Sequence, residues 1–208
     1  DLNGADEVFA FTPTQLAAGG NQAPTVTITA NPGFSGPLGI TFDSAGDLWV
    51  ANNASTTIYE FSAADLPTLA SVSAVTLVPN VILSDDGAGS IQGPWALIFD
   101  TAGNLWSSNA NTPFTVVEFA QSVLGTTAGP TPAVTLSPTT DKKGNVSLAA
   151  PNGIAFDNLG NLAAISSATP FGIAEFGTDN LITGAVAKTL LVGTKTTLNL
   201  PEIGRAHV

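Results

Sequence analysis

One motif recurs three times at a fixed interval, and this repeat constrains the fold more than any other feature of the chain. The motif Pro-x-x-x-x-Phe-Asp-x-x-Gly-Asn/Asp-Leu begins at Pro37, Pro94 and Pro151, so the interval is 57 residues. Such a period indicates one supersecondary unit that buries its apolar surface against neighbouring copies. The chain is therefore expected to be a row of similar units.

Each unit contains four runs of strand length. The first run has the form Gly-Ile-x-Phe, the second begins at Leu-Trp, the third ends at Glu-Phe, and the fourth is a Val-Thr-Leu segment. We expect fourth strands at residues 26–28, 75–77, 134–136 and 188–190. The Asp-x-x-Gly-Asn/Asp segment predicts a tight turn between the first two strands, because glycine adopts positive φ and aspartate caps its own backbone.

The repeat predicts an all-β fold, a partial β-propeller of about three and a half four-stranded antiparallel blades. Phe11 and Leu16 have the same spacing as Phe61 and Leu66, which indicates that the chain opens on the rear half of a blade. The expected divisions of this single partial domain are residues 1–36 (the half blade), 37–93, 94–150, and 151–201 with the start of a further blade. A sandwich would not repeat its sequence so faithfully.

The last residues depart from the repeat. Pro201 should open another Gly-Ile-x-Phe-Asp string, but the chain continues as Glu-Ile-Gly-Arg-Ala-His-Val over 202–208. This segment resembles the translation of a sequencing adapter, so we expect a non-native tail, with a genuine polar tail as the alternative. Arg205 and His207 then take no part in function. Because closed propellers have typically four to eight blades, we expect the full protein to be longer and to supply the remaining blades.

Charge and composition narrow the partners. Sixteen acidic and five basic residues give a net charge of −11, which disfavours nucleic acid and anionic membrane surfaces. No apolar run reaches the roughly 18 to 20 residues of a membrane span, so no membrane insertion is expected. The absence of cysteine excludes disulfides and thiolate metal sites. Low charge with abundant Ala, Thr, Ser and Gly favours an extracytoplasmic or secreted bacterial protein.

The string Pro-x-Gly-Ile-x-Phe-Asp-x-x-Gly-Asn-Leu-Trp-Val resembles blades of the NHL-repeat, SMP-30/gluconolactonase-like and streptogramin-lyase-like propellers. The resemblance implies a propeller whose relatives include lactonases, a lyase and binding proteins. In the SMP-30-like lactonases, an Asn or Asp between the proline and the glycine ligates a divalent metal. Here those positions hold Leu38, Trp95 and Asn152, so Asn152 alone matches. The lyase relatives use histidines, and His207 does not align with their pattern.

Residues that recur in every unit are interpreted first as structural. Trp49 and Trp106 are expected to pack between blades, with carbohydrate stacking as the alternative. The aspartates at one repeat position are expected to form turns, and the glutamates at another to be structural or surface charges; they are Asp43, Asp100 and Asp157, and Glu60, Glu118 and Glu175. Trp95 differs, because the resemblance to the SMP-30-like lactonases implies that its position faces the central channel, so it is a candidate ligand contact.

Polar loop residues that do not repeat are further candidates, because loops on one face of a propeller surround the channel mouth. The uncharged candidates are Asn52, Asn53, Asn109 and Asn111; the charged ones are Asp85, Asp86, Asp141, Lys142 and Lys143. Asp85 and Asp86 could hold Ca²⁺, although a solvated loop is favoured. No cofactor is predicted, the alternative being a divalent cation such as Ca²⁺.

No set of acid, base and nucleophile emerges from these residues. The sequence therefore predicts a binding or scaffolding module whose ligand is a small molecule, a glycan or a protein. Two alternatives stay open: a metal-dependent lactonase or hydrolase of the SMP-30-like type, for which Asn152 is the argument, and a structural domain of a surface protein.

Overall fold

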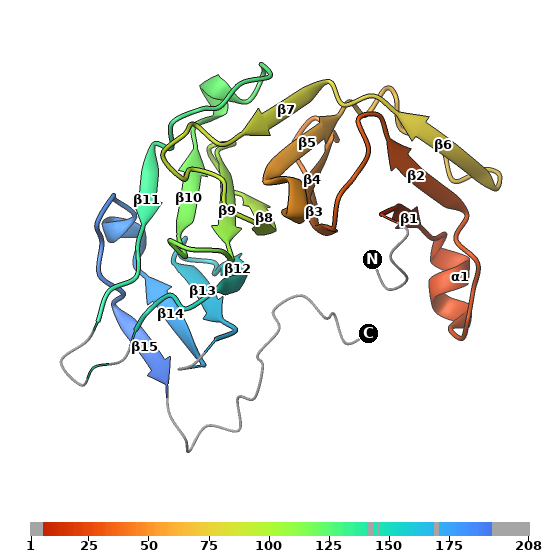
Figure 1. Ribbon diagram of the computed structural model, residues 1–208. Coiled ribbons are helices and arrows are strands. Elements are labelled where there is room, and N and C mark those ends of the chain that lie inside the picture. The colour runs from red at the N-terminus through yellow and green to blue at the C-terminus, as the bar shows by residue number, and fades with distance from the viewer. Residues whose placement is uncertain (1–5, 141–143, 145, 169–170, 193–208) are drawn as a thin grey trace.

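The computed structural model describes residues 6–140, 144, 146–168 and 171–192. Its strands form four sheets that lie side by side in an arc (Figure 1). The first sheet contains β1 (Val8–Ala10), β2 (Val26–Ala30) and β6 (Ser73–Leu77). The second contains β3 (Pro37–Phe42), β4 (Leu48–Asn52), β5 (Thr57–Phe61) and β7 (Val81–Ser84).

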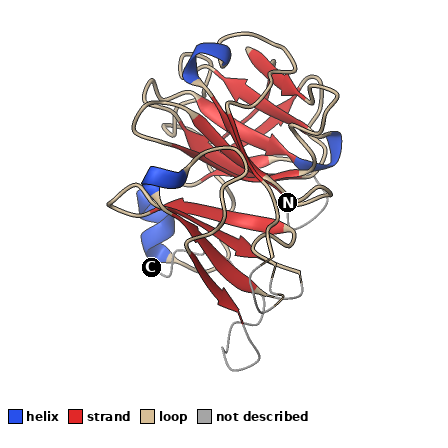
Figure 2. Ribbon diagram, turned by 90° about the vertical axis from the view of Figure 1, so that its left-hand side faces the viewer, coloured by secondary structure: helices blue, strands red, loops and turns tan. Residues whose placement is uncertain are grey.

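The other two sheets repeat this pattern. The third contains β8 (Pro94–Phe99), β9 (Leu105–Asn109), β10 (Val116–Phe119) and β11 (Val134–Leu136). The fourth contains β12 (Pro151–Phe156), β13 (Leu162–Ser166), β14 (Gly172–Phe176) and β15 (Thr189–Val192). The helical segments are short: α1 (Pro13–Ala18), η1 (Asn53–Ser55), η2 (Gln121–Val123) and η3 (Thr178–Asn180). Figure 2 shows how strands dominate the molecule. The predicted all-β partial propeller is confirmed.

The turn between the first two strands of each unit is built around one aspartate. Asp100 Oδ1 accepts hydrogen bonds from the amides of Ala102 and Asn104, each over 2.9 Å. Gly103 has a φ of +83°, which the turn requires and which glycine adopts without strain. Asp43 and Asp157 accept the equivalent bonds in their own units. The three recurring aspartates therefore form the turns, as their repetition indicated.

Neighbouring sheets pack through apolar side chains of the first two strands. Trp49 on β4 contacts Phe99 on β8 edge to face, with ring centroids 5.8 Å apart. Trp106 on β9 contacts Phe156 on β12 in the same way, also over 5.8 Å. Both indoles are nearly inaccessible, at 3% and 2% exposed. The predicted packing of the two tryptophans between blades is what the structure shows, and it buries the largest side chains of the core.

One predicted strand lies in a different sheet from the one expected. Residues 75–77 were expected to close the second sheet, but β6 pairs in parallel with β2 of the first sheet. The edge of β5 is instead occupied by β7, whose Val81 and Leu83 are buried. Val81 and Leu83 fill the interface with the third sheet, whereas Val75 and Leu77 are only partly buried, against the apolar cluster between the first and second sheets. Deeper burial explains why β7 closes the second sheet.

Among the described residues, no helix is long and apolar enough to cross a membrane.

Candidate functional site

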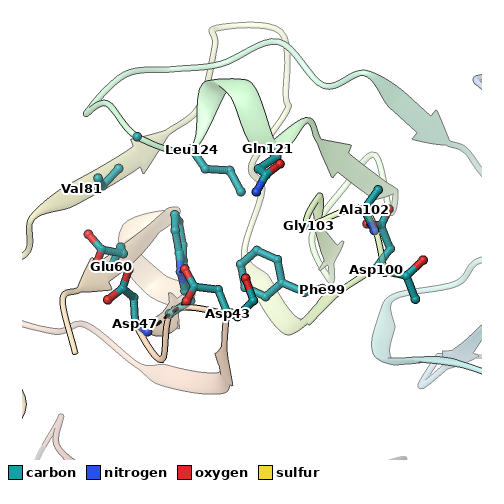
Figure 3. Close-up of a pocket in the computed structure, with 14 residues that line it drawn as sticks. Asp43, Asp47, Glu60, Val81, Phe99, Asp100, Ala102, Gly103, Gln121 and Leu124 are labelled. Atoms are coloured by element: carbon teal, nitrogen blue, oxygen red, sulfur yellow. Dashed lines mark hydrogen bonds between the residues drawn. The ribbon is translucent and has the colours of Figure 1, made fainter.

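A cleft lies between the second and third sheets, at the end where the aspartate turns are located (Figure 3). Its volume is about 590 Å³. Four carboxylates line it together with aromatic and amide side chains: Asp43, Asp47, Glu60 and Asp100, with Trp49, Phe99 and Gln121 among the others. The cleft therefore combines a strongly acidic wall with an apolar one.

Glu60 is the most perturbed group in this cleft. It lies opposite Trp49 in the β4–β5 ladder and is 6% exposed. Burial, reinforced by the carboxylates of Asp47, Asp43 and Asp65, raises the pKa of Glu60 from 4.5 to about 7. Such a carboxyl holds a proton near neutral pH and can donate it to a bound group. The recurrence of Glu60 in every unit indicated a structural or surface charge, and its raised pKa is evident only from the structure.

The same arrangement recurs in the next unit. Glu118 lies opposite Trp106, and burial followed by the charge of Asp100 raises its pKa. A second cleft of about 530 Å³ lies between the third and fourth sheets and includes Asp100 and Asp157. Because both clefts follow from the repeat, their carboxylates are explained by blade construction. The spacing of aspartate, tryptophan and glutamate in the sequence was the signal that could have revealed them.

Three candidate residues lie at the opposite end of the innermost strands. Leu38, Trp95 and Asn152 occupy equivalent positions near the starts of β3, β8 and β12, where each strand departs from regular pairing with its neighbour. Leu38 is 42% exposed and Trp95 is 38% exposed. Both apolar side chains are accessible to solvent, and the residue at this repeat position differs in all three units.

The innermost strands approach each other closely here. A Cβ atom on Gly39 would lie 2.1 Å from the backbone oxygen of Trp95, so glycine is required for β3 and β8 to come this near. In the third of the equivalent positions, Asn152 Oδ1 is buried and has no hydrogen-bond partner among the described atoms. The arrangement thus offers two exposed apolar side chains on adjacent strands and one amide oxygen that lacks a donor.

Asn52 and Asn109, two of the predicted ligand contacts, form hydrogen bonds with loops of the protein itself. Both are 0% exposed at the ends of β4 and β9. Asn109 accepts a hydrogen bond from the amide of Gln92 over 3.0 Å and donates to Ser90 O and Thr115 Oγ1 over 3.0 and 2.9 Å. Asn52 accepts from the amide of Ser35. Each side chain holds the loop that enters its unit, so a ligand would have to displace that loop to reach it.

Asn53 and Asn111 also form hydrogen bonds within the protein. Asn53 Nδ2 donates to the backbone oxygen of Pro94 over 3.2 Å, which connects the second sheet to the third. The Asn111 amide donates to Gln92 O over 3.2 Å. The bond from Asn111 fastens the loop after β9 to the loop before β8.

The acidic pair at 85–86 organises its own loop. Asp85 accepts from Ser90 Oγ, the Ile91 amide and the Gly87 amide, over 3.1 to 3.2 Å. Asp86 Oδ1 accepts from the amides of Ala88 and Ser90. Burial opposes the ionisation of Asp85, but the hydrogen bonds outweigh it and lower its pKa. Both carboxylates are therefore engaged in a turn.

Over the ranges that the structure describes, no group of three or more His, Cys, Asp or Glu side chains is arranged to hold a metal ion. Asp141, Lys142, Lys143, Arg205 and His207 lie outside those ranges, so their predicted roles stay predictions.

The fold and the repeated interfaces define a β-propeller, of which the described residues provide three four-stranded sheets and one three-stranded sheet. No protein-family model matches the sequence, and no curated protein sequence matches it. Solved propeller structures, in contrast, superpose on the chain. The periplasmic gluconolactonase PpgL of Pseudomonas aeruginosa superposes with a TM-score of 0.54 at 17% identity, over 91% of this chain and 51% of that one.

A putative 6-phosphogluconolactonase of Bacteroides fragilis gives a TM-score of 0.50 at 17% identity, over 83% of this chain and 41% of that one. Virginiamycin B lyase of Staphylococcus aureus gives 0.48 at 15% identity, over 79% of this chain and 43% of that one. The chain thus spans about half the length of these structures, or less. At such identities the likeness of the first two structures, with TM-scores of 0.54 and 0.50, establishes the β-propeller fold alone.

Proposed function

We propose that the chain is part of an extracytoplasmic binding or scaffolding propeller, which holds its ligand at the channel end of the innermost strands. The observation that carries this proposal is the exposure of Trp95 and Leu38 on adjacent strands, β8 and β3, at 38% and 42%. An exposed indole beside an exposed aliphatic side chain suits the apolar face of a sugar ring or a small planar molecule.

The other polar candidates support binding over catalysis. Asn52, Asn109, Asp85 and Asp86 use their side chains to hold loops, as their hydrogen bonds show. Rigid loops of this kind preorganise a binding surface and lower the entropic cost of association. The net charge of −11 favours neutral or cationic ligands over anionic ones.

The test is a binding screen with neutral oligosaccharides, read by tryptophan fluorescence. Trp49 and Trp106 are buried, so a ligand at the channel end should change mainly the emission of Trp95. The Trp95→Ala variant should fold normally and lose binding. Steady hydrolysis of a lactone or ester panel by the protein would contradict the binding role.

A second candidate, a metal-dependent lactonase of the SMP-30-like type, is favoured by one observation, the unpartnered Oδ1 of Asn152. A hard divalent cation requires several oxygen ligands, which further blades would have to supply. Titration calorimetry with Ca²⁺ on the complete protein separates the two candidates. Heat of binding that disappears in Asn152→Ala would support the lactonase, and its absence would leave the binding role.

A further inference from the structure

The first strand of the second sheet, β3, exposes side chains whose equivalents on β8 and β12 are buried or packed on a tryptophan. Ile40 on β3 is 50% exposed, while Leu97 and Ile154 at the same repeat position are 8% and 7% exposed. Phe42 is 56% exposed. Its counterparts Phe99 and Phe156 each pack on a tryptophan of the preceding sheet. The side chains are equivalent, so the difference comes from what covers them.

The sheet that precedes β3 is incomplete at the corresponding place. It contains β1, β2 and β6, and its cluster with the second sheet covers residues of β4 and β5, such as Val50, Tyr59 and Phe61. In the third sheet, the strand next to β10 is β9, which carries Trp106. In the part of the chain that the structure describes, β1 pairs only with β2. Among the described residues, this sheet therefore has no equivalent of the first and second strands of the other sheets.

The register of β1 matches that of β10 residue for residue. Val8 pairs with Ile28 and Phe9 with Thr27, while Val116 pairs with Leu136 and Val117 with Thr135. Adding 108 to the residue numbers of the two β1 pairs gives the two β10 pairs, and this shift is close to two repeat intervals. The free edge of β1 is consequently equivalent to the edge of β10 that binds β9.

We propose that Ile40, Phe42 and the free edge of β1, together called the open face, form a docking surface for a β-hairpin with the first-strand and second-strand sequence of this repeat. The second strand of the hairpin pairs with β1 as β9 pairs with β10. Its tryptophan packs edge to face on Phe42, as Trp49 packs on Phe99. The interface continues one that the chain already forms twice. This inference is independent of the proposed ligand site.

The test is a fusion protein in which a copy of residues 94–108 precedes Asp1, because the shift of 108 positions places that copy in register with β1. Hydrogen exchange of the Val8–Ala10 amides should slow about tenfold or more as the edge becomes hydrogen-bonded. The melting temperature should rise as Ile40 and Phe42 become buried.

Two substitutions give the matched controls. Trp106→Ala made only in the fused copy should reduce the rise in melting temperature, and Phe42→Ala in the host should do the same. The two changes together should be less than additive, because they remove one contact. A synthetic peptide of residues 94–108, added to the unmodified chain, provides a second arm should the fusion fail to fold.

Failure of both the fusion and the peptide to protect β1 overturns the proposal. So does protection of β1 in the unmodified chain that increases with protein concentration, since that result assigns the open face to a second copy of the chain.

Discussion

The indole Nε1 of Trp106 donates a hydrogen bond of 3.1 Å to Oδ2 of Asp100, six positions earlier. The same bond joins Trp49 to Asp43 over 3.2 Å. In the fourth sheet Ala163 replaces the tryptophan, and Asp157 Oδ2 accepts from Asn161 Nδ2. The bond ties the side chain that fills the interface between sheets to the turn that sets the strand pairing, so packing and turn geometry stabilise each other.

The first prediction concerns this aspartate. Asp100→Ala removes four hydrogen bonds, from Ala102, Asn104 (two) and Trp106, and should lower the free energy of unfolding by about 2–3 kcal/mol. Asp157→Ala is the matched control and should cost less, because no indole is lost there. Urea unfolding at pH 7 measures both. Equal losses would show that the indole bond adds nothing.

The pH dependence of the same site has a defined sign. Burial opposes the charge of Asp100, but hydrogen bonds from Trp106 and Asn104 outweigh it and lower its pKa in the folded state. The stabilisation is therefore complete above the unfolded pKa of about 3.9 and is lost as the pH falls through the folded pKa. Asp100→Asn should flatten the acid limb of the stability curve, which chemical unfolding between pH 2 and 5 would reveal.

Glu60 should act in the opposite direction. Its folded pKa of about 7 lies above the ordinary 4.5, so the folded state binds the proton more tightly than the unfolded state. Its contribution to stability is greatest below pH 4.5 and declines as the pH rises to about 7. Glu60→Gln should remove this decline and make the protein more stable than the parent at pH 8. Glu118→Gln should change stability in the same direction.

Thermal unfolding of these variants at pH 5 and pH 8 is the measurement. A parent protein whose stability is unchanged or rises between those pH values, with Glu60→Gln showing the same profile, would contradict the raised pKa.

Ala150 occupies a position where two other units carry glycine. Its φ is +50°, and Gly36 and Gly93 at the equivalent positions have φ of +62°. A side chain at positive φ is strained, so Ala150→Gly should raise the free energy of unfolding by about 0.5–1 kcal/mol. The reverse change, Gly93→Ala, should destabilise, since its Cβ would lie 2.4 Å from Asn111 Nδ2. A stabilising Gly93→Ala would refute this account.

Asn109 offers a test of its structural role. Asn109→Ala leaves the Gln92 amide and the Ser90 oxygen without their partner and should cost about 2–4 kcal/mol. Asn109→Ser should recover part of this loss, because Ser166 at the equivalent position accepts from the Ala149 amide and donates to Ser147 O. Thermal melts of the two variants are compared; a serine variant no better than alanine would show that the shorter side chain cannot bridge the loop.

The repeat in the sequence determined the fold class, the first three strands of each complete unit, the turns around Asp43, Asp100 and Asp157, and the packing of Trp49 and Trp106. These features follow from local patterns that every unit repeats: turn residues at fixed offsets, and apolar residues at positions that must meet a neighbour. The local pattern is sufficient to predict these features because every unit packs against its neighbours in the same way.

The tertiary structure alone decided which strand joins which sheet and which polar side chains are buried. In the structure β6 pairs within the first sheet, Asn52 and Asn109 are buried beneath loops, and Glu60 lies near three carboxylates. The physical reason is that the burial of a side chain and the electrostatic field acting on it depend on residues that are far apart in the chain. Ile40 and Leu97 occupy one repeat position with similar side chains, yet one is half exposed and the other buried, because only the second has a complete sheet against it.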